Sequence, residues 1–246
     1  MLKFQFLGSN DSVQEQNNGN TSLLISGSEG TLVIDLSCNL FAAVSAKIDG
    51  VILTHEHIDH LYALPSLLHQ LWLEGRANPL TLYLSSGLAP LVEGMLDLFQ
   101  IRQKTNMFEI LLCSNPSFSV GSMEITTFKT DHTPHSIGVI LQEGGSKLVY
   151  TCDTKPLDEI HPQMIGAQVL IHEASGTQKE RETLLKKGHS SGYDGAIMAK
   201  ELKVSQLYLC HLPQGDEAKI TILNEARAIF PSTKLPNILE EVVISP

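Results

Sequence analysis

The sequence predicts a mixed α/β protein with β-sheets in the middle and helices outside. Short apolar or alternating runs joined by turns fill the first third of the chain, and later such runs alternate with helical patterns. The chain has 246 residues, of which 42% are hydrophobic, so it can bury one sizeable core. We therefore expect residues 1–246 to form a single domain.

The expected strands are short and are bounded by turn residues. Residues 2–7 alternate and end at Gly8, and residues 22–25 and 32–36 flank the hairpin signal Gly27-Ser28-Glu29-Gly30. A second hairpin is expected around Gly144-Gly145. The remaining strands are expected over residues 51–54, 80–84, 123–130, 137–142, 147–151, 169–172, 207–210 and 241–244.

Helices are expected where apolar residues recur at helical spacing. They cover residues 59–73, 87–102, 190–202 and 220–229. Ser190 and Ser191 open the third of these helices and can cap it. The free backbone N–H groups at this helix end, next to His189, would form a phosphate-binding site, or phosphate seat.

Charge and composition narrow the partners that the protein can have. The formal charge is −10, which predicts weak general affinity for nucleic acid. The densest basic cluster, within residues 179–187, also contains acidic residues and is best explained as a solvated helix face. No apolar run is long enough to span a membrane, and the first residues do not resemble a signal peptide, so we expect a cytoplasmic protein.

The four cysteines are Cys38, Cys113, Cys152 and Cys210, and none belongs to a CxxC pair. We expect reduced, mostly buried thiols rather than a disulfide framework. Cys152 and Cys210 precede candidate site residues. Strand alternation predicts that their side chains point away from the site, into the core.

The strongest chemical signal is the segment Thr54-His55-Glu56-His57-Ile58-Asp59-His60, which follows the strand expected over residues 51–54. Alternate side chains of an extended chain point the same way, so His55, His57 and Asp59 can face one point. Three imidazoles and a carboxylate within six residues are the ligands that zinc accepts. The segment therefore predicts a metal site.

This HxHxDH motif resembles that of the metallo-β-lactamase superfamily. Three later segments match the superfamily's other motifs in order: residues 131–138, 150–154 and 207–211. The resemblance implies an αββα sandwich, with two mixed β-sheets flanked by helices and metals at the strand ends. It also implies seven metal ligands, namely His55, His57, Asp59, His60, His132, Asp153 and His211.

In that arrangement His55, His57 and His132 hold one metal ion, Asp59, His60 and His211 hold a second, and Asp153 is shared. The resemblance implies two divalent ions per chain, Zn²⁺ first and Mn²⁺ as the alternative. Two such ions suit hydrolysis of a phosphodiester by an activated water. Asp59 can also accept a proton during the reaction.

Two further segments resemble the HEAT and HST motifs of ribonuclease Z and its phosphodiesterase relatives. They are Ile171-His172-Glu173-Ala174-Ser175 and Gly188-His189-Ser190-Ser191. The resemblance implies that His189 protonates the leaving oxygen and that Glu173 holds its ring. Asp35 ends an expected strand and is either an acceptor behind the histidine loop or a turn aspartate. His135 is a weaker alternative to His132, and we expect His69 and His161 to be structural.

Two features of ribonuclease Z are missing from this sequence. A short hairpin joins residues 132 and 153, which leaves no room for the arm that grips transfer RNA. Gln16 and Asn18 stand where the loop near the start of ribonuclease Z is basic. The expected substrate is therefore either an RNA 3′ end or a small or cyclic phosphodiester. The resemblance also implies that the protein could form a homodimer.

Two alternatives to a phosphodiesterase remain open from the sequence. A hydrolase of lactones, esters or thioesters would use the same metal site without His189. A non-catalytic metal-binding module is also conceivable, although its ligand set would then be expected to have decayed.

Overall fold

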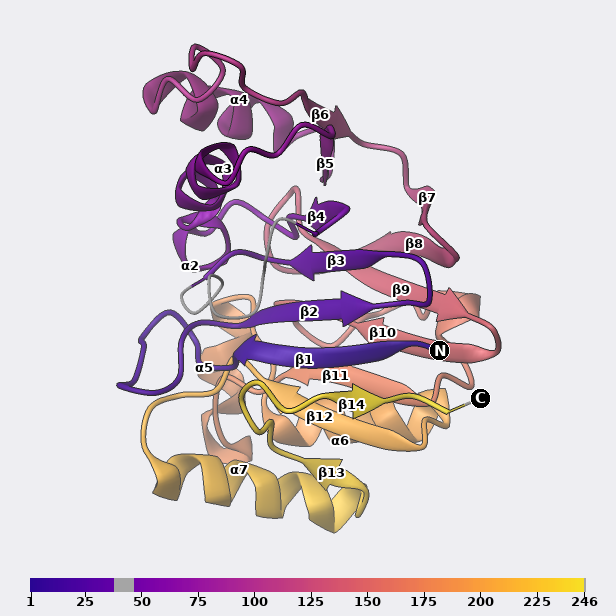
Figure 1. Ribbon diagram of the computed structural model, residues 1–246. Helices are drawn as coiled ribbons and strands as arrows, with labels where there is room; N and C mark the ends of the chain where they lie inside the picture. The colour runs from indigo at the N-terminus through magenta and orange to yellow at the C-terminus, as the bar shows by residue number, and fades with distance from the viewer. Residues whose placement is uncertain (38–46, 246) are drawn as a thin grey trace.

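Two mixed β-sheets of seven strands each lie face to face at the centre of the structure (Figure 1). The structure is a computed structural model that describes residues 1–37 and 47–245, so Cys38 lies outside the described residues. Helices cover the outer face of each sheet. The expected sandwich of two mixed sheets flanked by helices is therefore confirmed.

The first sheet has the strand order β14-β1-β2-β3-β4-β5-β6. Its strands pair antiparallel from β14 to β3 and parallel from β3 to β6. The ends of β3 and β4 therefore lie at the same edge. The strands are β1 (Lys3–Gly8), β2 (Ser22–Ser26), β3 (Thr31–Ile34), β4 (Gly50–Ile52), β5 (Leu80–Tyr83), β6 (Ile110–Cys113) and β14 (Val242–Val243).

The second sheet has the order β13-β12-β11-β10-β9-β8-β7. Strands β7 to β10 form an antiparallel meander, and β10, β11, β12 and β13 run parallel. The carboxyl ends of these four parallel strands therefore lie at one edge. The strands are β7 (Ser117–Val120), β8 (Met123–Lys129), β9 (Ile137–Glu143), β10 (Ser146–Tyr150), β11 (Val169–Glu173), β12 (Gln206–Cys210) and β13 (Thr233–Lys234).

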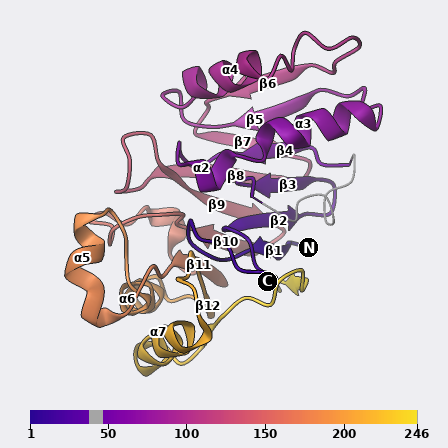
Figure 2. The same cartoon turned by 90° about the vertical axis from the view of Figure 1, so that its left-hand side faces the viewer.

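The main helices form the two outer layers, as the turned view shows (Figure 2). One layer packs on the first sheet and the other on the second, and a third apolar cluster fills the space between the sheets. The first layer contains α2 (Ile58–Leu61), α3 (Leu64–Leu73) and α4 (Ala89–Leu98), and the second contains α6 (Gly192–Leu202) and α7 (Asp216–Ile229). The short helix α5 covers Arg181–Lys186. Short 3₁₀ turns cover Pro162–Met164 (η1) and Gln178–Glu180 (η2).

The structure differs from the sequence-based elements in a few places. The helix expected over residues 59–73 is divided into α2 and α3, because Pro65 in the first turn of α3 has no N–H to continue a helix from α2. Strands β6, β7 and β13 and helix α5 were not expected. Strand β7 is mostly exposed, so its sequence carries no buried-face pattern.

The three described cysteines, Cys113, Cys152 and Cys210, are free thiols, as expected. Among the described residues, no helix is both long enough and apolar enough to cross a membrane.

Candidate metal centre

The candidate metal centre lies where the parallel strands of both sheets end. Asp35 follows β3 directly, His55 follows β4, Asp153 follows β10, and His211 follows β12. Glu173 is the last residue of β11. Side chains from both sheets therefore meet at one edge, where ligand sites of α/β folds gather.

Three of these strand ends contain a residue with left-handed backbone. Asp35 has φ 58°, Cys152 has φ 56°, and His211 has φ 51°. This conformation costs a residue with a Cβ atom about 1–2 kcal/mol. It turns the chain sharply as the strand ends, and the side chains of His211 and of Asp153, the residue after Cys152, reach the site from there.

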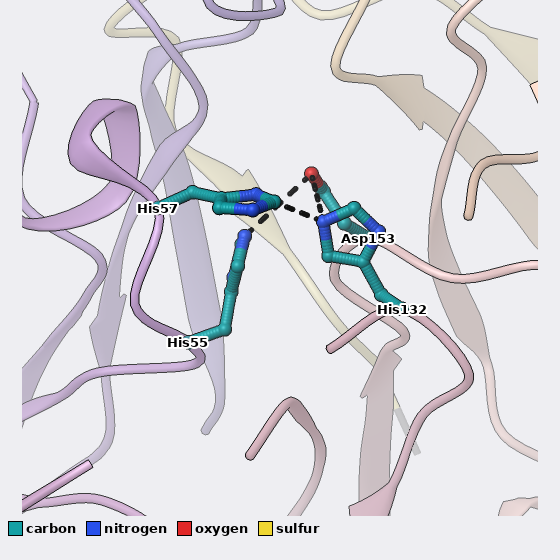
Figure 3. A group of neighbouring side chains, drawn as sticks. All are labelled: His55, His57, His132 and Asp153. Carbon is teal, nitrogen blue, oxygen red and sulfur yellow. Dashed lines mark hydrogen bonds and ion pairs between the residues drawn. The ribbon is translucent and has the colours of Figure 1, made fainter. Parts of the chain in front are cut away.

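Four side chains form the first cluster: His55, His57, His132 and Asp153 (Figure 3). One nitrogen or oxygen atom of each lies within 4.8 Å of the others. Nε2 of His132 is 3.0 Å from Nδ1 of His57. His55 and Asp153 are buried, whereas His57 is exposed, so the cluster opens to solvent on the side of His57.

Asp59, His60 and His211 form a second cluster with the same spacing. Oδ2 of Asp59 is 3.6 Å from Nε2 of each histidine. Oδ2 of Asp153 is 3.5 Å from Nε2 of His60 and 3.1 Å from Nε2 of His211. The same oxygen is 3.8 Å from Nε2 of His132, so Asp153 lies between the two clusters.

The back of each of four imidazoles is held by a hydrogen bond. In every case Nδ1 has the partner, which leaves Nε2 to face the cluster. The Nδ1 atoms contact Thr54 Oγ1 (from His55, 3.0 Å), Asp35 Oδ2 (from His60, 2.8 Å), the Gly188 carbonyl (from His132, 2.8 Å) and Ser175 Oγ (from His211, 2.9 Å). Such contacts fix ring orientation at metal sites.

Gly188 is required at its position next to His132. It has φ 84°, and a Cβ atom there would lie 2.8 Å from His132 Nδ1. Its carbonyl oxygen accepts the hydrogen bond from that same atom. A side chain would displace the ring, so glycine brings the backbone close enough to orient His132.

The clusters contain buried polar atoms that have no hydrogen-bond partner. They include His55 Nε2, His60 Nε2 and Asp153 Oδ1. An unsatisfied buried polar atom costs about 1–3 kcal/mol. Both imidazole nitrogens face the clusters, where Asp153 Oδ2 also lies, and imidazole nitrogen with carboxylate oxygen is the donor set of a borderline divalent ion. The residues therefore fit divalent metal ions.

The charges within the clusters shift one another's pKa values. Burial alone lowers the pKa of His60, but Asp153 and Asp35 outweigh burial and raise it well above its ordinary value. Burial lowers the pKa of His55. Burial raises the pKa of Asp153, but His211 and His60 reverse this and lower it well below its ordinary value. Asp153 is thus held as a carboxylate.

His189 and Glu173 form a pair at the edge of the clusters. Nδ1 of His189 is 3.2 Å from both carboxylate oxygens of Glu173, and Glu173 is fully buried. The His189 ring lies 4.6 Å from the His132 ring and 5.2 Å from the His211 ring. Burial lowers the pKa of His189, but the hydrogen bond to Glu173 outweighs it and raises the pKa.

A family profile described as "Beta-lactamase superfamily domain" matches residues 37–212 of the chain. This match spans more than half of the 246 residues. The chain belongs to this superfamily.

One protein of similar sequence and two solved structures of similar fold agree with this assignment. Ribonuclease Z of Methanothermobacter thermautotrophicus is 24% identical over 301 aligned positions, covering 99% of this chain and 97% of the relative. The metallo-β-lactamase fold protein YhfI from Bacillus subtilis superposes with TM-score 0.83, at 23% identity and 98% coverage of both chains. The short form of human tRNase Z superposes with TM-score 0.78, at 19% identity, covering 99% of this chain and 100% of that chain.

The other histidines lie outside the two clusters of this superfamily member. His135 packs against Gly87, where a Cβ atom would lie 2.1 Å from its Nδ1. His69 stacks on Trp72, with ring centroids 5.4 Å apart. His161 caps η1 by accepting from the N–H of Gln163. His132 and not His135 therefore joins the superfamily's histidine segment in space.

Asp35 is both a turn residue and an acceptor behind the histidine loop, the two roles that were considered as alternatives. It occupies a left-handed turn position, and its carboxylate also accepts from the Thr54 N–H at 2.9 Å and contacts His60. Cys152 packs behind the cluster, with Sγ 3.6 Å from His55 Nδ1. Burial raises the pKa of its thiol to about 12, so it stays protonated there. Cys210 is buried in the core between the sheets, as expected.

Ser191 caps the helix after His189, as expected, but the phosphate seat expected at the same helix end is occupied. Helix α6 begins at Gly192, and its first turn is closed by a capping box between Ser191 and Asp194. The Ser190 hydroxyl is bonded to the Thr154 carbonyl. The Asp194 carboxylate therefore takes the place of a phosphate at this helix end.

Sequence reasoning gave no role to Thr54, Gly188 or Ser175. Thr54 and Ser175 each place a hydroxyl against the Nδ1 atom of a cluster histidine. Their only signal in the sequence is a position one or two residues from a candidate site residue at a strand end.

Proposed function

We propose that this chain is a metal-dependent phosphodiesterase that uses two divalent ions, with Zn²⁺ as the first choice and Mn²⁺ as the alternative. The supporting observation is that the Glu173–His189 pair faces the same space as both histidine clusters. A hydrolase of the superfamily needs only the metal cluster to activate water. The additional acid–base pair suits a reaction whose leaving alkoxide requires a proton.

In this proposal His55, His57 and His132 hold one ion, and Asp59, His60 and His211 hold the other. Asp153 lies between the two clusters and serves both. The partner of each Nδ1 atom leaves four histidines with Nε2 as the ligand atom. His57 differs, because its Nδ1 faces His132 at 3.0 Å. When bound, the two ions would activate a water and stabilise the phosphoryl oxygens.

His189 supplies the proton to the leaving oxygen. Its Nδ1 is occupied by Glu173, which leaves Nε2 for the substrate. The hydrogen bond to Glu173 outweighs burial and raises the pKa of the ring, which favours its protonated form. Asp59 stands between His60 and His211 and is the acceptor for the proton that the attacking water loses.

The loop after β1 favours a small phosphodiester, or a short RNA end, over the body of a transfer RNA. Asn18 uses its side chain within the loop, where Oδ1 accepts from the Ser9 N–H at 2.9 Å and Nδ2 donates to Asn10 Oδ1 at 2.8 Å. Glu15 is bonded to Lys219 of α7. These polar groups stabilise the loop itself and are not free to hold RNA.

The connection between His132 and Asp153 also favours a small phosphodiester or a short RNA end over the body of a transfer RNA. Strands β9 and β10 are joined by a tight turn at Gly144 and Gly145. The alignment with the ribonuclease Z relative is 301 positions long although this chain has 246 residues, so the relative has segments without a counterpart here. A net charge of −10 adds no general attraction for a polyanion.

The test compares substrate classes on purified protein. We expect hydrolysis of bis(p-nitrophenyl) phosphate that is lost on treatment with a chelator and restored by Zn²⁺ or Mn²⁺. A panel of lactones and thioesters should react more slowly by at least about tenfold. A faster reaction with the lactone panel would favour an ester hydrolase on the same site, and metal binding without turnover of any substrate would favour a non-catalytic module.

A further inference from the structure

The Ser175 hydroxyl links two parts of the candidate centre that the proposed mechanism treats separately. Ser175 lies two residues after Glu173, just beyond the end of β11. Its Oγ atom is 2.7 Å from Oε2 of Glu173 and 2.9 Å from Nδ1 of His211. One hydroxyl therefore joins the acid–base pair to a side chain of the second cluster.

The direction of these two hydrogen bonds follows from the chemistry of the partners. The Glu173 carboxylate also accepts from the Thr154 N–H and lies against His189 Nδ1, so it acts as an acceptor throughout. The Ser175 O–H must then donate to Glu173. Because a hydroxyl has only one proton, its oxygen must accept from His211, which places a proton on His211 Nδ1.

A proton on Nδ1 leaves the lone pair of His211 on Nε2. That atom faces the cluster, 3.1 Å from Asp153 Oδ2 and 3.6 Å from Asp59 Oδ2. His60 obtains the same arrangement directly from a carboxylate, since its Nδ1 contacts Asp35. His211 reaches its carboxylate through an intervening hydroxyl, and that carboxylate also serves His189.

We propose that Ser175 is a positioning residue that fixes the tautomer and ring orientation of His211 and connects both to Glu173. The inference rests on the metal site of the proposed function. It implies that loss of this hydroxyl weakens the binding of one ion, at the His211 cluster, and leaves the other ion unaffected. Partners of this kind typically change metal affinity by about 10–100-fold.

The test uses Ser175→Thr and Ser175→Val, which have the same shape and differ only in the hydroxyl. Zinc affinity is measured by competition with a chromophoric chelator. We expect Ser175→Val to weaken one of the two binding steps by about 10–100-fold, while Ser175→Thr stays within about threefold of the native chain. Thr177→Val is the control, because it removes a nearby hydroxyl that bonds to Glu180.

A second measurement reports the tautomer itself. In zinc-loaded protein with ¹⁵N-labelled histidine, the Nδ1–H of His211 should give a slowly exchanging downfield proton signal, identified by its absence in His211→Ala. This signal should persist in Ser175→Thr and be lost in Ser175→Val. A protected signal together with unchanged zinc affinity in Ser175→Val would overturn the inference.

These outcomes separate the inference from the proposed function. Neither zinc affinity nor the proton signal depends on turnover of a phosphodiester. If the native chain binds zinc but cleaves no phosphodiester, the function fails and the role of Ser175 can still be confirmed. If Ser175→Val behaves as the native chain in both measurements while phosphodiesterase activity is present, only the role of Ser175 is wrong.

Discussion

Oδ2 of Asp35 lies 2.8 Å from Nδ1 of His60, and both side chains are fully buried. The same carboxylate accepts from the backbone N–H and the hydroxyl of Thr54, which in turn contacts His55 Nδ1. Asp35 thus holds one histidine of each cluster from behind. Asp35 therefore supports the orientation of His60 directly and that of His55 through Thr54.

Asp35→Asn tests this control without a change in shape. The amide has one oxygen instead of two and carries no charge, so it cannot accept all of these bonds. We expect metal affinity to fall by about 10–100-fold, measured as metal retained after dialysis against a chelator. Asp49→Asn is the matched control, because Asp49 is exposed and bonds to the N–H of Thr31. Equal retention by both variants would contradict the role of Asp35.

The metal content should be two ions per chain. Elemental analysis of protein purified without chelator should show about two equivalents of zinc or manganese. His132→Ala and His211→Ala should each reduce this content, because each removes a donor from a different cluster. Full activity with one tightly bound ion would rule out the dinuclear proposal.

His189→Ala should separate proton transfer from metal binding. We expect both ions to stay bound and kcat for an alkyl phosphodiester to fall by about a hundredfold or more, the usual effect of losing a positioned acid. The loss should be smaller with a p-nitrophenyl leaving group, which departs without a proton. Glu173→Gln should have a milder effect if Glu173 only orients the ring.

The outcome depends on comparing the two leaving groups in the same variant. Equal losses on both substrates would remove the general-acid role and leave only substrate binding. Loss of a metal ion from His189→Ala would instead make His189 a ligand, which its position near Asp153 and His211 would permit.

The Glu15–Lys219 pair should make stability depend on acid pH. The hydrogen bond from Lys219 lowers the pKa of Glu15 from 4.5 to about 2. A carboxylate with a lowered folded-state pKa stabilises the fold above its unfolded pKa and loses that effect as pH falls. Because Glu15 is partly exposed, we expect Glu15→Gln to lower the free energy of unfolding by about 1–2 kcal/mol at pH 7.

That difference between Glu15→Gln and the native chain should be constant above about pH 5.5 and should shrink as pH falls below about 4.5. Urea denaturation at a series of pH values measures it. A difference that stays the same down to pH 3.5 would show that charge on Glu15 does not contribute.

Precursor transfer RNA should be a poor substrate. The side chain of Asn18 is bonded within the loop after β1, the β9–β10 turn is short, and the chain is acidic. We expect cleavage of precursor transfer RNA to be slower than cleavage of short phosphodiesters at physiological salt. Efficient cutting at a single site near the 3′ end would contradict this proposal.

Much of the fold and the grouping of the candidate site could be predicted from the sequence. Motif residues such as His55 and Asp153 follow strands with clear apolar or alternating patterns, and parallel strands bring their ends together. The division of the helix after Asp59 was not predicted, because its apolar spacing continues through the break and only Pro65 signals it.

The residues behind the cluster could not be assigned in the same way. Ser175 and Thr54 act through a hydroxyl that reaches a histidine of another segment, and Ser175 is 36 residues from His211. Neither residue has a periodic pattern. The phosphate seat expected at the N-terminus of α6 is filled because Ser191 and Asp194 have the three-residue spacing of a capping box.

The left-handed residues at positions 35, 152 and 211 have a consequence for the thermostability of the protein. The backbone at each position would be less strained with glycine, but glycine would remove the carboxylate, the thiol or the imidazole found there. Together they hold roughly 3–6 kcal/mol of backbone strain at one edge, comparable with the whole net stability of a small domain. Attempts to raise the melting temperature of the protein should therefore begin elsewhere in the chain, where a substitution does not disturb the candidate metal centre.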